Sequence, residues 1–212
     1  IVTGIVVSND ADEETVTQTK ILVQPLLKGL ICLHGDATDA NSKKAVEHAV
    51  DATIQGIGIE MFLSMVSLSE LDDNEVSSHE KKKKKKSVNV VDGAVLQERV
   101  WLLPILKSSS TKSNSVSLYR PRLSFFQGHI LGLARKCDIT SARGDATAAE
   151  CAIQKSRVIE LWALFPSFCH NPMDLDVTFP TLCQTLVKAM GDKRYPQLVA
   201  PISTGLKKIV EG

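Results

Sequence analysis

The chain has 212 residues with 25 Lys and Arg against 24 Asp and Glu, a net charge of +1, and 43% of its residues are hydrophobic. This hydrophobic fraction supplies a substantial core and excludes a chain that is disordered throughout. Only 5% of the residues are aromatic, which fits helix-on-helix packing better than a β-sandwich, where aromatic and β-branched residues dominate.

The charges are unevenly distributed along the chain. Residues 1–93 carry 10 basic and 15 acidic side chains, which gives −5, whereas residues 94–212 carry 15 basic and 9 acidic side chains, which gives +6. Without the six consecutive lysines at 81–86 the first part would carry −11. A nucleic-acid contact is therefore expected at the lysine run or in the second half.

Three further features bound the class of protein. The five cysteines form no C-x-x-C pair, so we expect reduced thiols that serve as small hydrophobic residues rather than disulfides or metal ligands. No apolar run approaches the roughly 20 residues that cross a bilayer, which predicts a soluble protein without a membrane partner. The chain begins Ile-Val-Thr with no initiator Met or leader, which favours an internal piece of a longer protein.

The first part of the chain predicts three helices. An acidic first turn and a leucine stripe indicate a helix from about Asp12 to Leu33, kinked by Pro25 and closed by Gly35. Apolar residues at 46, 49, 50, 54 and 57 indicate a second helix, opened by Asn41 or Ser42.

A glycine pair, Gly56 and Gly58, separates that helix from a short third one at 59–66. We interpret the pair as a hinge or close-packing point rather than a phosphate loop, because no strand precedes it. Residues 69–93 lack an apolar period and place acidic residues directly before the lysine run. They are predicted to form a long, mostly disordered loop.

Helical spacing resumes at about Ala94 and is followed by a polar connector at 108–115 and a helix from Leu118 to Cys137. Residues 157–190 indicate two amphipathic helices joined by a proline-containing turn, as in one unit of an α-solenoid. Asn171 and Pro172 are expected to end the first of these helices.

Thr178 is expected to cap the second helix of this pair, with Pro180 in its first turn and Gly191 as a left-handed residue at its end. A last helix is predicted to start at Pro196, with Pro201 bending it. Together the elements indicate an all-α fold of roughly eight helices, a HEAT- or armadillo-like α-solenoid, with a compact helical bundle as the alternative. The expected division is helical repeats at 1–68, the loop at 69–93 and helical repeats at 94–212, all in one continuous solenoid.

Two segments of the second half share a recognisable wording. Residues 98–106 read ERVWLLPIL and residues 161–169 read LWALFPSFC, followed by the turn Pro172-Met173-Asp174. Together with residues 25–34 and 58–63, they resemble, in the same order, segments of the HEAT-repeat family of ribosomal RNA-processing protein twelve. The loop at 69–93 and residues 109–117 depart from that pattern.

The resemblance implies a non-catalytic α-solenoid scaffold of the nucleolus and nucleus, which shuttles to the cytoplasm in subunit export. Its implied partners are pre-ribosomal RNA and ribosome assembly factors, in pre-rRNA processing. A nuclear transport receptor or an armadillo-type adaptor is the alternative, because the acidic first part would suit basic cargo. Neither interpretation involves a cofactor or a small-molecule substrate.

The residues alone offer only basic candidates for a nucleic-acid site. The lysine run would attract phosphates or act as a nuclear localisation signal, or it is a solvated loop neutralised by its acidic neighbours. The other basic pairs either follow phosphates along one face or complement helix dipoles. The candidates are Lys81, Lys82, Lys83, Lys84, Lys85, Lys86, Arg120, Arg122, Arg135, Lys136, Lys193, Arg194, Lys207 and Lys208.

No catalytic or metal site is predicted. Cys169 and His170 are the only adjacent thiol and imidazole, but sequence neighbours at a helix end point apart, so we interpret the pair as chance. Asp174 and Asp176 have the pattern of turn and cap residues rather than of a paired-carboxylate site.

Overall fold

In a computed structural model of the chain, residues 13–68, 99–112, 120–142 and 146–211 are described. Every regular element within these ranges is a helix, so the all-α prediction is confirmed. The lysine run and the rest of the predicted loop at 69–93 lie outside the described residues.

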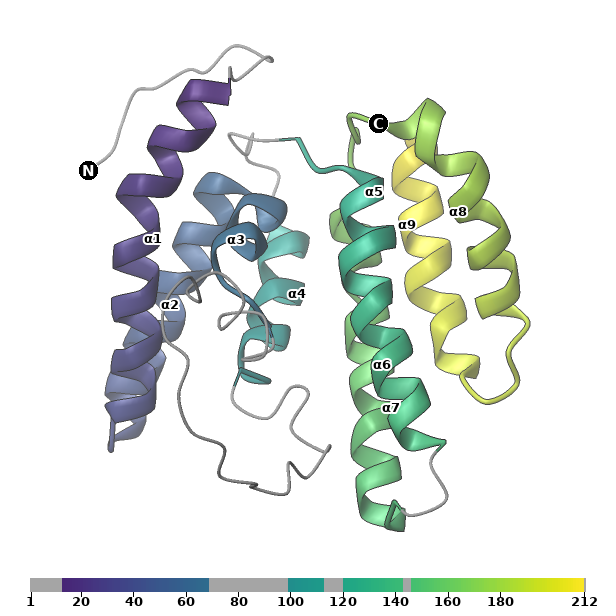
Figure 1. Ribbon diagram of the computed structural model, residues 1–212, viewed down its shortest axis with the longest axis horizontal. Helices are drawn as coiled ribbons and strands as arrows, with labels where there is room; N and C mark the ends of the chain where they lie inside the picture. The colour runs from purple at the N-terminus through teal and green to yellow at the C-terminus, as the bar shows by residue number, and fades with distance from the viewer. Residues whose placement is uncertain (1–12, 69–98, 113–119, 143–145, 212) are drawn as a thin grey trace, which may run out of the picture.

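The helices form two neighbouring blocks (Figure 1). In the first block α1 packs on α2, and α2 packs on α4, with α3 beside them. The bounds are α1 (Glu13–Asp36), α2 (Ala40–Ile57), α3 (Ile59–Met65) and α4 (Leu102–Lys112).

In the second block α6 packs along α7, α5 contacts α8, and α9 packs against the 3-10 turns η3 and η4. Because α5, η2 and α6 follow one another without a break, the described residues contain eight continuous helices, in line with the predicted number. The bounds are α5 (Leu123–Phe125), the π-helical turn η2 (Phe126–Ile130), α6 (Leu131–Ser141), α7 (Ala148–Trp162), η3 (Phe165–Ser167), α8 (Leu175–Met190), η4 (Pro196–Leu198) and α9 (Val199–Glu211).

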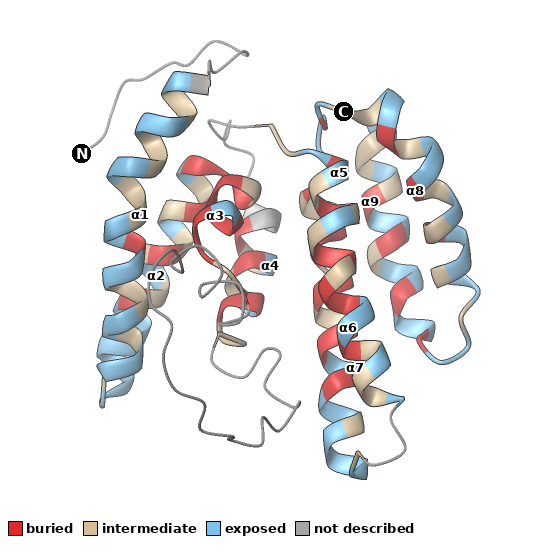
Figure 2. Ribbon diagram, viewed as in Figure 1, coloured by how far each residue is buried: buried red, intermediate tan, exposed pale blue. Residues whose placement is uncertain are grey.

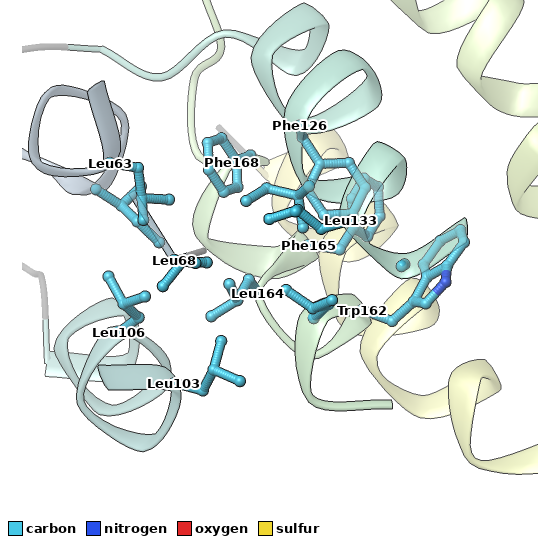
Figure 3. Packing of buried hydrophobic residues seen from close by; sticks show 14 of the residues in the cluster. Leu63, Leu68, Leu103, Leu106, Phe126, Leu133, Trp162, Leu164, Phe165 and Phe168 are labelled. Atoms are coloured by element: carbon cyan, nitrogen blue, oxygen red, sulfur yellow. The ribbon is translucent and has the colours of Figure 1, made fainter. Parts of the chain in front are cut away.

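One hydrophobic cluster runs through both blocks. Leu164 points toward Leu106 of α4, while the neighbouring Phe165 and Phe168 face Phe126 (Figure 3). The rings of Phe126 and Phe165 have centroids 5.1 Å apart. Buried residues lie between the helices, and the outer sides of α1 at one end and α8 at the other are largely exposed (Figure 2). This layered order is that of a stacked repeat rather than a closed bundle.

The apolar stripe predicted on the second helix is confirmed, since Val46, Val50, Ile54 and Ile57 of α2 are buried. Gly58 separates α2 from α3 and has a φ of 84°, a left-handed conformation that favours glycine. The predicted break is therefore confirmed at Gly58, whereas Gly56 of the predicted pair lies inside α2 and does not interrupt it.

The ends of the first two helices differ from prediction. α1 continues through Pro25 to Asp36, so Gly35 lies inside the helix and does not close it. The cap of α2 is Asp39, whose carboxylate accepts a hydrogen bond from the Ser42 backbone N–H at 2.8 Å. Asn41 and Ser42 are therefore not the caps, because an acidic residue one turn earlier satisfies the free N–H groups.

The predicted connector at 108–115 is wrong in its first half, because α4 extends to Lys112. The Ser108 hydroxyl donates to the Ile105 carbonyl, and the single hydroxyl hydrogen of Ser109 has that carbonyl and the Asp51 carboxylate of α2 as alternative acceptors. Serines of this kind satisfy their polarity inside a helix and give no turn signal. The helix predicted from Leu118 starts only at Leu123, directly after Pro121 and Arg122.

The pair at 157–190 contains the predicted two helices but different boundaries. α7 ends at Trp162, and Pro166 lies in the 3-10 turn η3, so the helix is broken well before Asn171. α8 starts after Asp174, and Thr178 lies within it. Thr178 is therefore not the cap, and Pro180 lies past the first turn.

Gly191, at the end of α8, does not have the left-handed conformation that a glycine at this position suggests. Gly191 has a φ of −84° and is right-handed, and its N–H bonds to the Val187 carbonyl. The predicted left-handed end is therefore wrong. Pro196 opens the last helical segment through η4, as predicted.

Candidate nucleic-acid interface

The described members of the basic set fall into two groups. The segment 120–122 precedes α5, and the end of α9 lies at the same end of the second block (Figure 1). Arg135 and Lys136 are instead on α6, in its middle, and Arg135 shares one surface hollow with Arg194 of the turn after α8. The structure thus brings together members of each group but does not align all of them in one ridge.

Arg120 is engaged within the protein. Its Nε donates to the Asn171 carbonyl at 2.9 Å, and its Nη2 donates to Asn171 Oδ1 at 2.6 Å. Asn171 has a φ of 47°, a left-handed conformation that asparagine tolerates better than most residues. The guanidinium therefore holds a sharp turn, and its hydrogen-bond donors are directed at backbone and amide oxygens.

Arg122 is bound to α3 of the other block. Its backbone N–H and its Nε both donate to the carboxylate of Glu60, each at 2.7 Å. The Glu60 side chain is only 12% exposed, whereas that of Arg122 is 57% exposed. The segment 120–122, called here the connecting segment, therefore joins the first block to the turn at 171–174 of the second.

Asp174 completes this junction. Its carboxylate accepts hydrogen bonds from the backbone N–H groups of Leu123 and Ser124, at 2.7 and 2.8 Å, and from the Thr178 hydroxyl. Burial by itself would raise the pKa of Asp174, but these hydrogen bonds outweigh it, so the pKa lies below the ordinary value. The aspartate thus caps α5 from a different part of the chain, while it also begins α8.

The second group surrounds a hollow of about 120 Å³ between α6, α7 and α8. Its floor is apolar and includes Trp162, and its charged lining is Arg135, Asp138, Asp192 and Arg194. These four charges cancel, so the positive surplus in this region comes from the neighbouring Lys136 and Lys193, both exposed. Among the described residues, Arg135, Lys136 and Lys193 make no ion pair.

Arg194 is held by a carboxylate network. Its Nη2 lies 2.7 Å from Asp192 Oδ2, and its Nη1 lies 3.3 Å from Asp138 Oδ1. The Tyr195 hydroxyl donates to Asp138 Oδ1 at 2.6 Å. Burial and this hydrogen bond raise the pKa of Tyr195 to about 12. The network fixes the turn after α8 to α6. Because Arg194 is paired with two carboxylates, its positive charge is largely neutralised locally.

The last basic pair lies on α9. Lys207 Nζ is 3.5 Å from Glu211 Oε1 one turn further along the helix, and Lys208 is in the last turn. Cations at this end complement the helix dipole, which is the alternative predicted for such pairs.

The Cys169 thiol has no nucleophilic character. The side chain is fully buried and its Sγ donates to the Phe165 carbonyl at 3.1 Å, while His170 is exposed. Burial raises the pKa of Cys169 well above its ordinary value, which disfavours the thiolate that would attack a substrate. The interpretation of the pair as chance adjacency is supported.

Other chemistry has no visible support in the described part of the chain. No group of three or more His, Cys, Asp or Glu side chains there could hold a metal ion. All five cysteines are free thiols. Within the same ranges, no helix is both long and apolar enough to cross a membrane.

Sequence reasoning missed one contact among the first three packed helices. The His34 ring stacks on Trp101 with centroids 3.7 Å apart, and His34 Nε2 lies 3.4 Å from Glu47 Oε1. The three residues come from α1, α2 and the turn before α4. Trp101 and His34 both lie in segments that carry the resemblance, but no local pattern showed that their rings stack.

The comparison with known proteins agrees with this architecture. The sequence model of the family described as ribosomal RNA-processing protein 12, HEAT repeats, matches residues 7–212. The chain belongs to this HEAT-repeat family. The helical stack, the Trp101 and Trp162 segments and the turn at 172–174 are thus features of a member of the ribosomal RNA-processing protein 12 family.

Two curated relatives are similar to the chain over most of its length. An RRP12-like protein of Drosophila melanogaster is 25% identical over 196 residues, which cover 89% of this chain and 11% of the relative. An RRP12-like protein of Homo sapiens is 26% identical over 171 residues, which cover 78% of this chain and 11% of the relative. The chain therefore spans about a ninth of the length of these ribosomal RNA-processing protein 12 relatives.

Proposed function

We propose that this chain is a non-catalytic scaffold segment in ribosome biogenesis, acting in pre-rRNA processing and in the maturation and export of pre-ribosomal subunits. The observation that carries the proposal is the family match over residues 7–212. A stacked helical segment offers an extended surface on which many weak contacts add, which suits a partner made of irregular RNA and protein.

The proposed partners are pre-ribosomal RNA and ribosome assembly factors, with nuclear transport machinery during export. The proposed location is the nucleolus and nucleus, with passage to the cytoplasm. The names of the two relatives support the ribosomal assignment.

For the RNA contact we propose the exposed basic residues of the second group, Arg135, Lys136 and Lys193, together with the lysine run at 81–86. The first three make no ion pair in the described structure, so their charge is available to phosphates. Arg120, Arg122, Arg194 and Lys207 would contribute less, because they already have acceptors or carboxylate partners. Lys208, in the last turn of α9, is a weaker candidate because it is half-buried.

The test is the salt dependence of binding to a single-stranded pre-rRNA fragment. Replacing Arg135, Lys136 and Lys193 by Ala should reduce the slope of log K against log salt by about 2, at roughly 0.7 per lost phosphate contact. Replacing the exposed Lys43 and Lys44 on α2 by Ala is the matched control and should leave the slope nearly unchanged. Equal slopes for wild type and the triple variant would contradict the proposed site.

A separate experiment tests the proposed role. The full-length protein should co-purify with pre-ribosomal RNA and assembly factors from a nuclear extract. Recovery of import cargo or a small GTPase without ribosomal RNA would favour the transport-receptor alternative instead.

A further inference from the structure

Helix α1 has two apolar sides, of which only one is covered. Leu27 is fully buried against α2, and Val23, Leu30 and Ile31 pack partly on the same core. A second stripe, called here the outer α1 face, is displaced around the helix by about a third of a turn. It consists of Leu22, Leu26, Gly29 and Leu33.

The outer α1 face is continuous and strongly exposed. Leu22, Leu26 and Leu33 are 72%, 69% and 57% exposed, and their spacing of four and seven residues puts them on one line of the helix. A helix that meets only water on that side would carry polar residues there. The stripe therefore has the composition of an interface rather than of a solvated surface.

A groove accompanies this face. A hollow of about 510 Å³ lies along α1 and α2, and its lining includes Leu26, Gly29 and Leu33 together with Ala49 and Thr53 of α2. A Cβ added to Gly29 would meet no atom within 4 Å. Small residues on the floor with leucines beside them form the groove into which the side-chain ridge of another helix packs.

The same pattern recurs at the opposite end of the stack. Ten of the 12 large hydrophobic residues that are exposed in the described structure lie on α1, α8, α9 or the turn directly before α8. Of the helices between the two ends, α6 and α7 contribute one residue each, Ile139 and Ile153, and α2 to α5 contribute none. The exposed members at the far end are Met173, Val177, Val187, Met190, Val199 and Val210.

We propose that the outer α1 face is covered by a further helical repeat of the same polypeptide, placed before α1 in a longer chain. The curated relatives are about nine times as long as this chain, so they contain ample sequence for additional repeats. A repeat of a solenoid buries its apolar side only by stacking on its neighbour. The stripe and its groove carry no charged side chain, which argues against an RNA backbone as the occupant.

The test compares alkylation of a cysteine placed at Leu26 in the full-length protein and in the 212-residue chain, read peptide by peptide by mass spectrometry. Leu26→Cys should react at least about tenfold more slowly in the full-length protein, because a covered side chain reacts only through opening of the interface. Ile153→Cys on α7 is the matched control, since Ile153 is 51% exposed outside the end faces. It should react at the same rate in both.

Equal rates for Leu26→Cys in the two proteins would overturn the proposal. Slow reaction that depends on the concentration of the 212-residue chain would identify a second copy as the occupant, and slow reaction only with pre-ribosomal particles present would identify another protein. Either result also overturns it. As a second measurement, Leu22→Glu with Leu26→Glu should lower the unfolding midpoint of the full-length protein but not of the 212-residue chain, with Ile153→Glu as the control.

Discussion

The sharpest prediction concerns Gly205 of α9, which packs directly against the side chains of Phe165 and Cys169. A Cβ at this position would lie 2.5 Å from Cδ1 and from Cε1 of Phe165, and 2.9 Å from Cys169 Sγ. Phe165 is fully buried and its ring is 5.1 Å from that of Phe126. The ring therefore cannot move aside without moving its neighbour.

The expected magnitude is the balance of two terms. Overpacking of a buried contact costs about 1 to 3 kcal/mol, and the very short distances place Gly205→Ala toward the upper end of that range. Replacing glycine by alanine inside a helix gains roughly 1 kcal/mol. We therefore expect Gly205→Ala to lower the free energy of unfolding by about 1 to 2 kcal/mol.

The matched control is Gly132→Ala in α6, where an added Cβ meets nothing within 4 Å. It has the same helix-propensity gain without the clash, so it should be stabilising by up to about 1 kcal/mol. Urea unfolding followed by circular dichroism measures both variants, and they should differ by about 2 to 3 kcal/mol. If Gly205→Ala were as stable as Gly132→Ala, the tight packing of α9 on η3 would be wrong.

Three further outcomes are expected. Asp174→Ala removes the cap of α5 and should cost about 1 to 3 kcal/mol in urea unfolding, whereas Asp176→Ala, exposed in the first turn of α8, should stay within about 0.5 kcal/mol. The pKa of Asp174 is lowered in the folded state, so its contribution is present above the unfolded value of about 3.9 and is lost as the pH falls through the folded pKa; wild type and Asp174→Ala should therefore converge in stability on acidification, and a gap that stays constant to the lowest pH would contradict this. In maleimide labelling the exposed Cys32 should react in the folded protein, while the buried Cys169 should react only on unfolding, and comparable rates for the two would refute the burial of Cys169.

Sequence patterns predicted those parts of the fold that depend on neighbouring residues. The stripe of α2 and the break at Gly58 are local features, because a helix face and a positive φ are set by residues within one or two turns. The number of helices follows from the same periodicity. The order of the motif segments along the chain indicated the family, since the Trp101 and Trp162 segments occur in the order expected for it.

The boundaries that were predicted wrongly depend on contacts between distant parts of the chain. Asp174 accepts N–H groups that are 50 and 51 residues away in sequence, so no local pattern could show that it caps α5. Ser109 is helical and buried because Asp51 of α2 accepts its hydroxyl across 58 residues. Local residue types favoured a connector there, and tertiary packing overrode them.

The sequence predicted which basic residues could belong to the candidate site, but not which of their side chains are free to contact phosphates. Sequence reasoning could count the basic residues of the second half, but it could not tell that Glu60 of α3 would bind Arg122 or that Asp138 would bind Arg194. Acidic partners separated by about 60 residues are invisible to charge counts over a window. The surplus of +6 in residues 94–212 already subtracts Asp138 and Asp192 but not Glu60, so the pairing of Arg122 with Glu60 lowers the charge that this surface offers to phosphates.

This reduction has a consequence for the proposed scaffold. By themselves, Arg135, Lys136 and Lys193 would supply about three phosphate contacts, too few for tight binding at physiological salt. Tight binding would then require other segments of the longer protein, whose weak contacts add because they are held on one chain. The relative orientation of the segments becomes as important as their charge. The connecting segment sets that orientation here, because Arg120 and Arg122 hold the second block to the first. Under the proposed function, two arginines that were predicted to contact RNA would instead serve RNA binding indirectly, by fixing where the free cations lie.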